Sequence, residues 1–481
     1  MKEKITSTES ASSVCYTLFS PGAEAGHAGH GVNASSASAR SPISGKSLSL
    51  RQNWLILSHA FNMDGRAASH TITDKIPHLL GAGIKPIVIS APTGRRDEVL
   101  PHYQVPAVAP SGLRFDLRHV LRMRFGSGWT YRITRSLMNL LLIPPLILER
   151  LFIHLESQWS WFVLAYFRGA QMIRAGKVDL IYSTGGANSA HYAGYLLAKR
   201  FGIPWMAEIH DPMVHENWKR SRMAYNWAGY LEKLICRHAS IAIWFTEKAL
   251  ERARERNPEL GDRGHAIIPG AEHPDFGDAR YVRREVMSIA HFGSLSATRN
   301  LEVFLQGFHR FLDQHPEARG IVRLEVYGSD PDNLSKAALT AFPYRDNVVL
   351  HGRLEFDPET GLSGRDRVLR YMRTSDCLLL LHGREPFCEE YIPSKLYEYA
   401  WARRPILALT WRNPQLDGLL AKVGHDVVNA ADAEGVARSL QNLYARWAND
   451  GLVDTMEEFQ FPVGSAVNEI LRLVGALDGI R

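Results

Sequence analysis

Residues 389–400 of the chain read EEYIPSKLYEYA, and they follow a short apolar run, Cys377 to Leu381. The apolar run predicts a buried strand, and the later residues predict a helix with Pro393 in its first turn, where a backbone N–H is not needed. The free N–H groups at such a helix start, together with the helix dipole, attract an anion. The stretch therefore predicts a strand, a loop and a helix with an anion site at its beginning.

The same order of strand, loop and helix recurs along the chain. In the first half, short apolar runs begin at Trp54, Pro86, Asp179, Trp205, Ile241 and Ala266. In the second half, they begin at Ile289, Leu324, Val348, Cys377, Pro405 and Val427. Strands that alternate with helices imply a parallel sheet covered on both faces. We expect an α/β protein with two Rossmann-like, doubly wound parallel-sheet domains that face a central cleft, with ligands outside the carboxyl ends of the strands.

A Pro/Gly-rich stretch, IPGAEHP (268–274), separates the two sets of strands. We predict a first domain at 51–270, a second at 275–460, and a C-terminal helix at 461–481 that returns toward the first domain. Residues 1–50 are rich in Ser, Ala and Gly and lack periodic apolar residues. Ordering them would cost conformational entropy without compensating burial, so we expect a disordered tail.

The composition is that of a soluble globular protein and excludes a disulfide-rich or membrane-spanning one. The 481 residues are 45% hydrophobic and 22% charged, as in soluble globular proteins. Four irregularly spaced cysteines exclude a disulfide framework or a zinc site and favour a reducing setting. The sequence has no apolar run of roughly 20 residues and no signal-peptide pattern, so we expect a cytoplasmic protein.

One region interrupts the alternation. Residues 113–136, between the second and third predicted strands, hold six arginines against the single acid Asp116, and an apolar stretch at 137–148 follows, then Trp159 and Trp161. Basic residues beside apolar ones suit an anionic membrane surface, so residues 113–161 predict peripheral attachment. Alternatively, the arginines form a solvated face and the leucines pack on the sheet. The basic residues are not accompanied by any nucleic-acid recognition motif, so nucleic-acid binding is not expected.

The predicted helix start at 392–395 also carries side chains suited to a nucleotide. Lys395 adds a positive charge near a bound diphosphate, and Glu398 can accept two hydroxyl hydrogens from a ribose. Glu390 and Glu398 are separated by seven residues. Because this pair of glutamates follows the fourth predicted strand of the second sheet, the segment resembles the E-x7-E motif of retaining GT-B glycosyltransferases. PSKLYEY (393–399) resembles the form of this motif in bacterial family-4 members that synthesise cell-surface polysaccharides.

Three further segments are similar to the same family, and the likeness extends over about residues 53–475. FGSLSATRNL (292–301) resembles its glycine-rich loop, with Arg299 in the place of the basic residue that contacts the donor diphosphate. IPWMAEIHDP (203–212) places His210 where relatives carry a residue near the donor sugar. MDGRAAS (63–69) occupies the place of the first glycine loop, without its paired glycines.

The resemblance implies which residues form the site. Catalytic roles fall to His210, Arg299, Lys395 and Glu390. The donor would contact Gly293, Ser294, Arg299, Glu390, Tyr391, Ile392, Pro393, Ser394, Lys395 and Glu398. The acceptor side would include Asp64, Gly65, Arg66 and Asp211. Arg299, Lys395 and the helix start would stabilise charge on the leaving diphosphate, Glu390 would orient sugar hydroxyls, and Glu398 would bind the ribose.

The implied activity is transfer of a sugar, with retention of configuration, from a nucleoside diphosphate to a lipid-linked or cell-envelope glycan such as lipopolysaccharide or exopolysaccharide. The protein would act at the cytoplasmic face of the inner membrane. A nucleotide-sugar epimerase of the same fold and a non-catalytic scaffold in polysaccharide assembly are the alternatives. We expect no metal and no cofactor besides the donor, although Asp330 and Asp332 imitate the D-x-D metal motif of another transferase fold.

Overall fold

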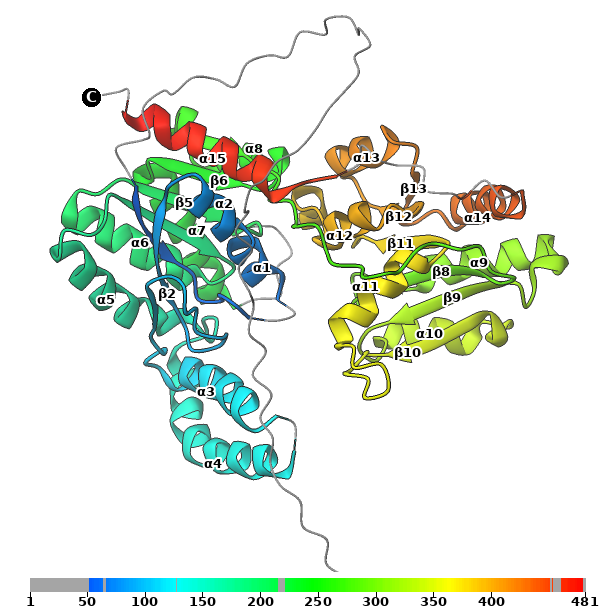
Figure 1. The fold of residues 1–481 in the computed structure, drawn as a ribbon, viewed down its shortest axis with the longest axis horizontal. Helices are drawn as coiled ribbons and strands as arrows, with labels where there is room; N and C mark the ends of the chain where they lie inside the picture. Colours follow the sequence, from blue (N-terminus) through cyan, green and yellow to red (C-terminus); the bar gives the residue numbers. More distant parts are fainter. Residues whose placement is uncertain are drawn as a thin grey trace, which may run out of the picture. The chain divides into compact units, whose positions relative to one another are not determined.

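The computed structural model describes residues 52–63, 66–126, 128–214, 221–449, 452 and 460–478. These residues form two parallel β-sheets, and helices cover both faces of each sheet (Figure 1). The predicted fold class is confirmed. The predicted tail at 1–50 and the acceptor-side residues Asp64 and Gly65 lie outside the described residues.

The first sheet has seven strands in the order β3-β2-β1-β4-β5-β6-β7, all parallel. They are β1 (Asn53–Leu57), β2 (Lys85–Ser90), β3 (His102–Gln104), β4 (Leu180–Gly185), β5 (Trp205–Ile209), β6 (Ile241–Trp244) and β7 (Gly264–Ala266). Of these seven strands, only β3 is not predicted from the sequence, since its three residues, HYQ, form no apolar run. The basic region therefore follows the third strand rather than the second.

Helices cover both faces of this sheet. They are α1 (Ala67–Thr73), α2 (Lys75–Gly81), α5 (Phe162–Arg174), α6 (Asn188–Phe201), α7 (Arg222–His238) and α8 (Glu247–Arg256). The strands are buried along nearly their whole length, as expected for a sheet with two covered faces.

The second sheet has six parallel strands in the order β10-β9-β8-β11-β12-β13. They are β8 (Met287–Phe292), β9 (Val322–Tyr327), β10 (Val348–Gly352), β11 (Cys377–Leu381), β12 (Ile406–Thr410) and β13 (Asp426–Asn429). Its helices are α9 (Glu302–Gln314), α10 (Asn333–Ala341), α11 (Gly364–Thr374), α12 (Lys395–Ala402), α13 (Pro414–Ala421) and α14 (Ala433–Ala448). The strand order reverses beside β1 and beside β8, where ligands of such sheets bind.

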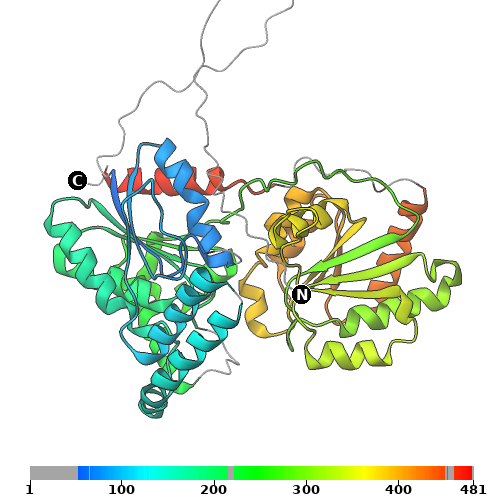
Figure 2. The same cartoon turned by 60° about the horizontal axis from the view of Figure 1, so that its bottom comes forward.

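The last helix leaves the second sheet. Helix α15 (Val463–Asp478) packs against α2 and buries Val467 and Ile470 in the same apolar cluster as Trp54 and Ile56 of β1 (Figure 2). Its apolar face, and not its position in the sequence, places it on the first sheet.

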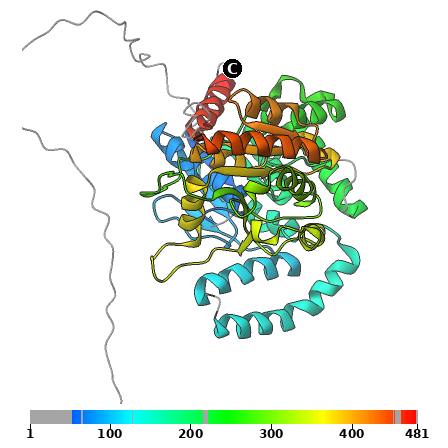
Figure 3. The same ribbon diagram turned by 90° about the vertical axis from the view of Figure 1, so that its right-hand side faces the viewer.

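Two long helices form the basic and apolar region. Helices α3 (Pro110–Phe125) and α4 (Trp129–Phe152) run side by side and extend beyond the first sheet (Figure 3). Their exposed large apolar side chains are Met123, Phe125, Trp129, Ile133, Leu137, Leu140, Leu141, Ile143, Ile147, Leu148, Leu151 and Phe152. Among the arginines, Arg118, Arg122, Arg124, Arg132 and Arg135 are exposed. The apolar stretch therefore does not pack on the sheet, contrary to the alternative interpretation.

The structure does not support a membrane role for Trp159 and Trp161, which the sequence assigned to this region. Trp161 is fully buried in the core of the first sheet, and its indole donates a hydrogen bond to the carbonyl of Val105. The indole of Trp159 donates to Glu149 at 2.8 Å. Trp129, at the start of α4, is the exposed tryptophan of these two helices, with 72% of its surface accessible. Within the described residues, every helix falls short of the length or hydropathy that crossing a bilayer requires.

Candidate functional site

A pocket of about 610 Å³ is lined by residues that follow the carboxyl ends of strands in both sheets. One wall comes from the second sheet and includes Arg299, Arg365 and residues 391–395, 397 and 398. The other comes from the first sheet and includes α1, His210, Asp211 and Phe245. The connecting stretch, Pro269 to Pro274, lines it as well. Most residues of the predicted site are therefore brought together at one place.

The beginning of α12 forms the cationic part of the pocket. Tyr391, Ile392, Pro393 and Ser394 line it directly before the helix, which starts at Lys395 with Ser394 as its N-cap. Pro393 therefore precedes the helix rather than lying in its first turn, and residues 386–390 before it form a separate 3-10 turn, η5. The helix start still faces the pocket, as the sequence predicts.

Glu398 is held between two cations. Lys395 Nζ donates to its Oε2 at 2.6 Å, and Arg365 Nη2 lies 2.5 Å from its Oε1. Burial opposes ionisation of this carboxyl, but Lys395 and Arg365 outweigh burial and lower its pKa to about 2. Glu398 is therefore an anion at neutral pH, and both its oxygens are engaged.

Arg299 is the third cation of this wall. Its Nη2 donates to the carbonyl of Ser294 at 3.1 Å, which ties the side chain to the loop after β8. Gly293 has a φ of +127°, a backbone conformation that residues with a side chain rarely adopt. A Cβ added at Gly328 would lie 2.0 Å from the carbonyl oxygen of Gly293, so the two glycines allow a close approach of the backbones. Gly293 and Ser294 shape this loop, but they are not among the residues that line the pocket.

Glu390 does not line the pocket. Its side chain is 92% buried, its backbone carbonyl accepts a hydrogen bond from Thr246 Oγ1 at 2.6 Å, and its Oε2 has no hydrogen-bond partner among the described residues. Burial raises its pKa to about 7, while Arg256 and Arg252 of α8 act in the opposite direction. The structure thus places Glu390 beside the start of α8 and outside the pocket lining.

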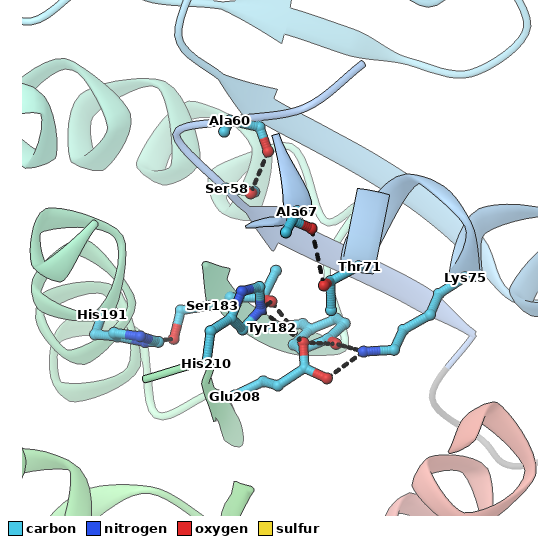
Figure 4. A network of polar contacts seen from close by, with 11 residues as sticks. Ser58, Ala60, Ala67, Thr71, Lys75, Tyr182, Ser183, His191, Glu208 and His210 are labelled. Atoms are coloured by element: carbon cyan, nitrogen blue, oxygen red, sulfur yellow. Dashed lines mark hydrogen bonds and ion pairs between the residues drawn. The ribbon is translucent and has the colours of Figure 1, made fainter. Parts of the chain in front are cut away.

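His210 is positioned by a buried polar network at the carboxyl end of the first sheet (Figure 4). Its Nε2 lies 2.9 Å from Thr184 Oγ1 and 3.5 Å from Glu208 Oε2. Thr184 Oγ1 donates to Glu208 at 2.5 Å, Tyr182 OH donates to it at 2.7 Å, and Lys75 pairs with it. The imidazole also stacks on Phe245, with ring centroids 4.8 Å apart.

The remaining acceptor-side residues lie on the first domain. Arg66 is the N-cap of α1, and its guanidinium lies 5.8 Å from the ring centre of Phe115 in α3. Asp211 is exposed and lines the pocket. Arg66 itself is not among the lining residues, although Ala67 and Ala68 beside it are.

Asp332, the second acid of the sequence that imitates a D-x-D motif, is engaged by its own helix. Asp332 caps α10, where its Oδ1 accepts from the backbone N–H groups of Leu334 and Ser335. Its Oδ2 accepts from Ser335 Oγ at 2.5 Å. Across the described residues, no three His, Cys, Asp or Glu side chains gather as a metal would require.

Four polar residues of this region have no role assigned from the sequence. Arg365 lies 33 positions before Glu398 on another helix, so no local pattern connects them. Lys75 looks like a surface lysine on an amphipathic helix, yet it is completely buried. Thr184 follows the apolar residues of β4, and Glu208 lies between Ala207 and Ile209 in β5. A charged residue inside an otherwise apolar strand was the one available signal.

Comparison with known proteins supports the fold. No protein-family model and no curated protein matches the chain. Among solved structures, it is similar to an alpha,alpha-trehalose-phosphate synthase (UDP-forming) from Burkholderia vietnamiensis, with a TM-score of 0.56, 12% identity, and coverage of 90% of this chain and 100% of that one. A synthase of the same description from Burkholderia xenovorans, in complex with glucose-6-phosphate, matches with a TM-score of 0.55, 13% identity, and coverage of 88% and 99%. The chain therefore has the GT-B fold of two Rossmann-like domains.

Proposed function

We propose that the protein is a glycosyltransferase that takes a sugar from a nucleoside diphosphate. The observation that supports this most is the wall formed by Arg299, Lys395 and the start of α12 beside the ionised Glu398. Cations and free backbone N–H groups would hold a diphosphate, and a carboxylate would accept ribose hydroxyls. The similar solved structures include UDP-forming synthases, which agrees with a nucleotide-sugar donor.

In the proposed reaction, the bond between the anomeric carbon and the diphosphate breaks, and the oxygen of an acceptor hydroxyl bonds to that carbon on the same face. The departing diphosphate takes up the hydroxyl proton, while Arg299 and Lys395 stabilise its growing charge. His210, from the first domain, would contact the sugar near the bond that breaks. The pocket volume of about 610 Å³ lies within the range of ligand sites, roughly 300–1,000 Å³. We further propose a family-4 type reaction with retention of configuration, which would transfer a hexose.

For the acceptor, we propose a lipid-linked or cell-envelope glycan, as in lipopolysaccharide or exopolysaccharide synthesis, bound on the side of α1 and Asp211. The exposed leucines of α4 and the exposed arginines of α3 and α4 support docking on an anionic membrane. The protein would then work peripherally on the cytoplasmic face of the inner membrane. The guanidinium of Arg66 lies 5.8 Å from the ring centre of Phe115 in α3, so α3 adjoins the proposed acceptor side.

The test is incubation of the purified protein with UDP-, GDP- and ADP-sugars, with and without membrane extract, followed by mass spectrometry of the products. Transfer of a sugar to a membrane component supports the proposal. Conversion of the nucleotide sugar into an isomer without any acceptor would identify an epimerase instead. Binding to membranes without any turnover would favour a scaffold.

A further inference from the structure

The hydrogen bonds around Glu208 determine where protons lie beneath the pocket. Burial opposes ionisation of the Glu208 carboxyl, but Lys75, which has no surface exposed, and His210 together outweigh burial and hold its pKa well below its usual range. As an anion, Glu208 can only accept hydrogen bonds. Tyr182 OH and Thr184 Oγ1 must therefore donate to its Oε2, at 2.7 and 2.5 Å.

This assignment fixes the role of His210. The Thr184 hydroxyl has one hydrogen, and Glu208 receives it, so the hydroxyl oxygen can interact with the imidazole only as an acceptor. His210 Nε2, 2.9 Å away, therefore carries a hydrogen and donates it. Within the described part of the chain, the other ring nitrogen, Nδ1, has no hydrogen-bond partner, and the residue lines the pocket.

We propose that Thr184 and Glu208 are positioning residues that hold His210 as the Nε2–H tautomer and so present Nδ1 as an acceptor for a sugar hydroxyl. This inference rests on the proposed function, since it assigns a sugar to the pocket. A histidine whose tautomer is fixed by a second residue can accept a hydrogen bond without first reorienting. Stacking on Phe245 fixes the plane of the ring in the same way.

Lys75 completes the arrangement. It begins α2, directly after the helix that lines the pocket, and its charge keeps Glu208 ionised inside the protein. The other polar groups around the network are Tyr182 and His191, and burial lowers the pKa of His191 to about 4, so His191 is neutral near pH 7. Lys75 and Glu208 thus form a buried ion pair, and loss of either partner alone would leave the other as an uncompensated buried charge.

Two substitutions of Thr184 and one control test the proposal. Thr184→Val keeps the shape but removes the acceptor, whereas Thr184→Ser keeps the hydroxyl. Ser183→Ala is the control on the same strand, because Ser183 bonds to His191 and Trp205 and not to His210. Nitrogen-15 NMR of histidine-labelled protein would report the tautomer, with His210→Gln used only to assign the resonance.

We expect an unprotonated Nδ1 at His210 in the wild type, Thr184→Ser and Ser183→Ala, and loss of this single tautomer in Thr184→Val. Transfer by Thr184→Val should show a kcat roughly three- to tenfold lower with a nearly unchanged donor KM, the effect of one neutral hydrogen bond. Thr184→Ser should restore kcat. A protonated Nδ1 in the wild type, or a Thr184→Val variant with unchanged tautomer and kcat, would overturn the inference. If the NMR pattern holds but no sugar is transferred, the proposed function is wrong and the tautomer assignment stands.

Discussion

Lys395 and Glu398, one turn apart at the start of α12, are joined by a 2.6 Å hydrogen bond from the ammonium to Oε2. Arg365 engages the other carboxylate oxygen. In the free protein, both oxygens that we assign to a ribose are therefore occupied by cations. Donor binding would replace one of these contacts by a hydroxyl and leave a cation available for the diphosphate.

Glu398→Ala should weaken donor binding. A hydrogen bond to a charged group contributes about 1.5–3 kcal/mol, so the donor Kd should rise by roughly 10- to 150-fold. Isothermal titration with the nucleotide sugar found in the activity screen measures this. Glu389→Gln, which changes a neighbouring acid that does not line the pocket, is the control. An unchanged Kd would remove Glu398 from the donor site.

Lys395→Ala and Arg299→Ala should lower kcat more than they raise the donor KM, because the charge that they neutralise grows as the diphosphate departs. Loss of one such donor costs on the order of 10²-fold in kcat. The double variant should lose less than the product of the two single effects if both side chains contact the same phosphate. Lys336→Ala on α10 is the matched control, and strict additivity would indicate separate sites of action.

Turnover should persist after metal ions are removed. Arg299, Lys395 and the start of α12 supply the positive charge that a divalent ion supplies in other transferases. The measurement is the transfer rate after dialysis against EDTA, with and without added Mn²⁺. If EDTA abolishes turnover and Mn²⁺ restores it, the metal-free proposal is wrong and Asp330 must be examined as a ligand.

Glu390 should make the stability of the protein depend on pH. Its pKa is raised from 4.5 to about 7 by burial, so the folded state binds an extra proton between these values. The stability that Glu390 contributes should therefore be fully present below about pH 4.5 and should be lost as pH rises through 7, by up to about 3 kcal/mol. Glu390→Gln should remove this decline in urea unfolding at pH 5 and 8. Glu389→Gln is the control, and an equal decline in both variants would contradict the role of burial.

The helices α3 and α4 should bind anionic vesicles. The triple variant Arg118→Glu, Arg122→Glu, Arg124→Glu should reduce co-sedimentation with phosphatidylglycerol vesicles, since each basic residue contributes about 1 kcal/mol. Binding by the wild type should weaken as salt rises, because exposed charges are screened beyond roughly 8–10 Å. A matched triple Arg→Glu variant at Arg345, Arg353 and Arg438 controls for net charge.

The same triple variant separates docking from a role in folding. Transfer to a lipid-linked acceptor should slow, whereas transfer to a short soluble acceptor should hardly change, because the donor residues lie on the second sheet. Equal loss on both acceptors would mean that α3 supports the fold or the pocket. The membrane proposal should then be abandoned.

The sequence by itself determined the two-sheet architecture. Strands such as Cys377–Leu381 are buried on both faces, so they appear as continuous apolar runs, and the polar turns after them mark the carboxyl ends where ligands bind. For the same reason, Lys395 and Glu398 could be assigned to a helix start beside the pocket. These features depend on residues close together in the chain.

Only the tertiary structure decided which distant side chains meet. Arg365 reaches Glu398, Lys75 pairs with Glu208, and Trp161 enters the core while the leucines of α4 stay exposed. Glu390 shares the local motif of Glu398, but its backbone carbonyl accepts a hydrogen bond from Thr246 at the start of α8, and the residue does not line the pocket. The physical reason is that burial and ion pairing depend on packing between elements, and a charge can be buried only where the fold brings its partner.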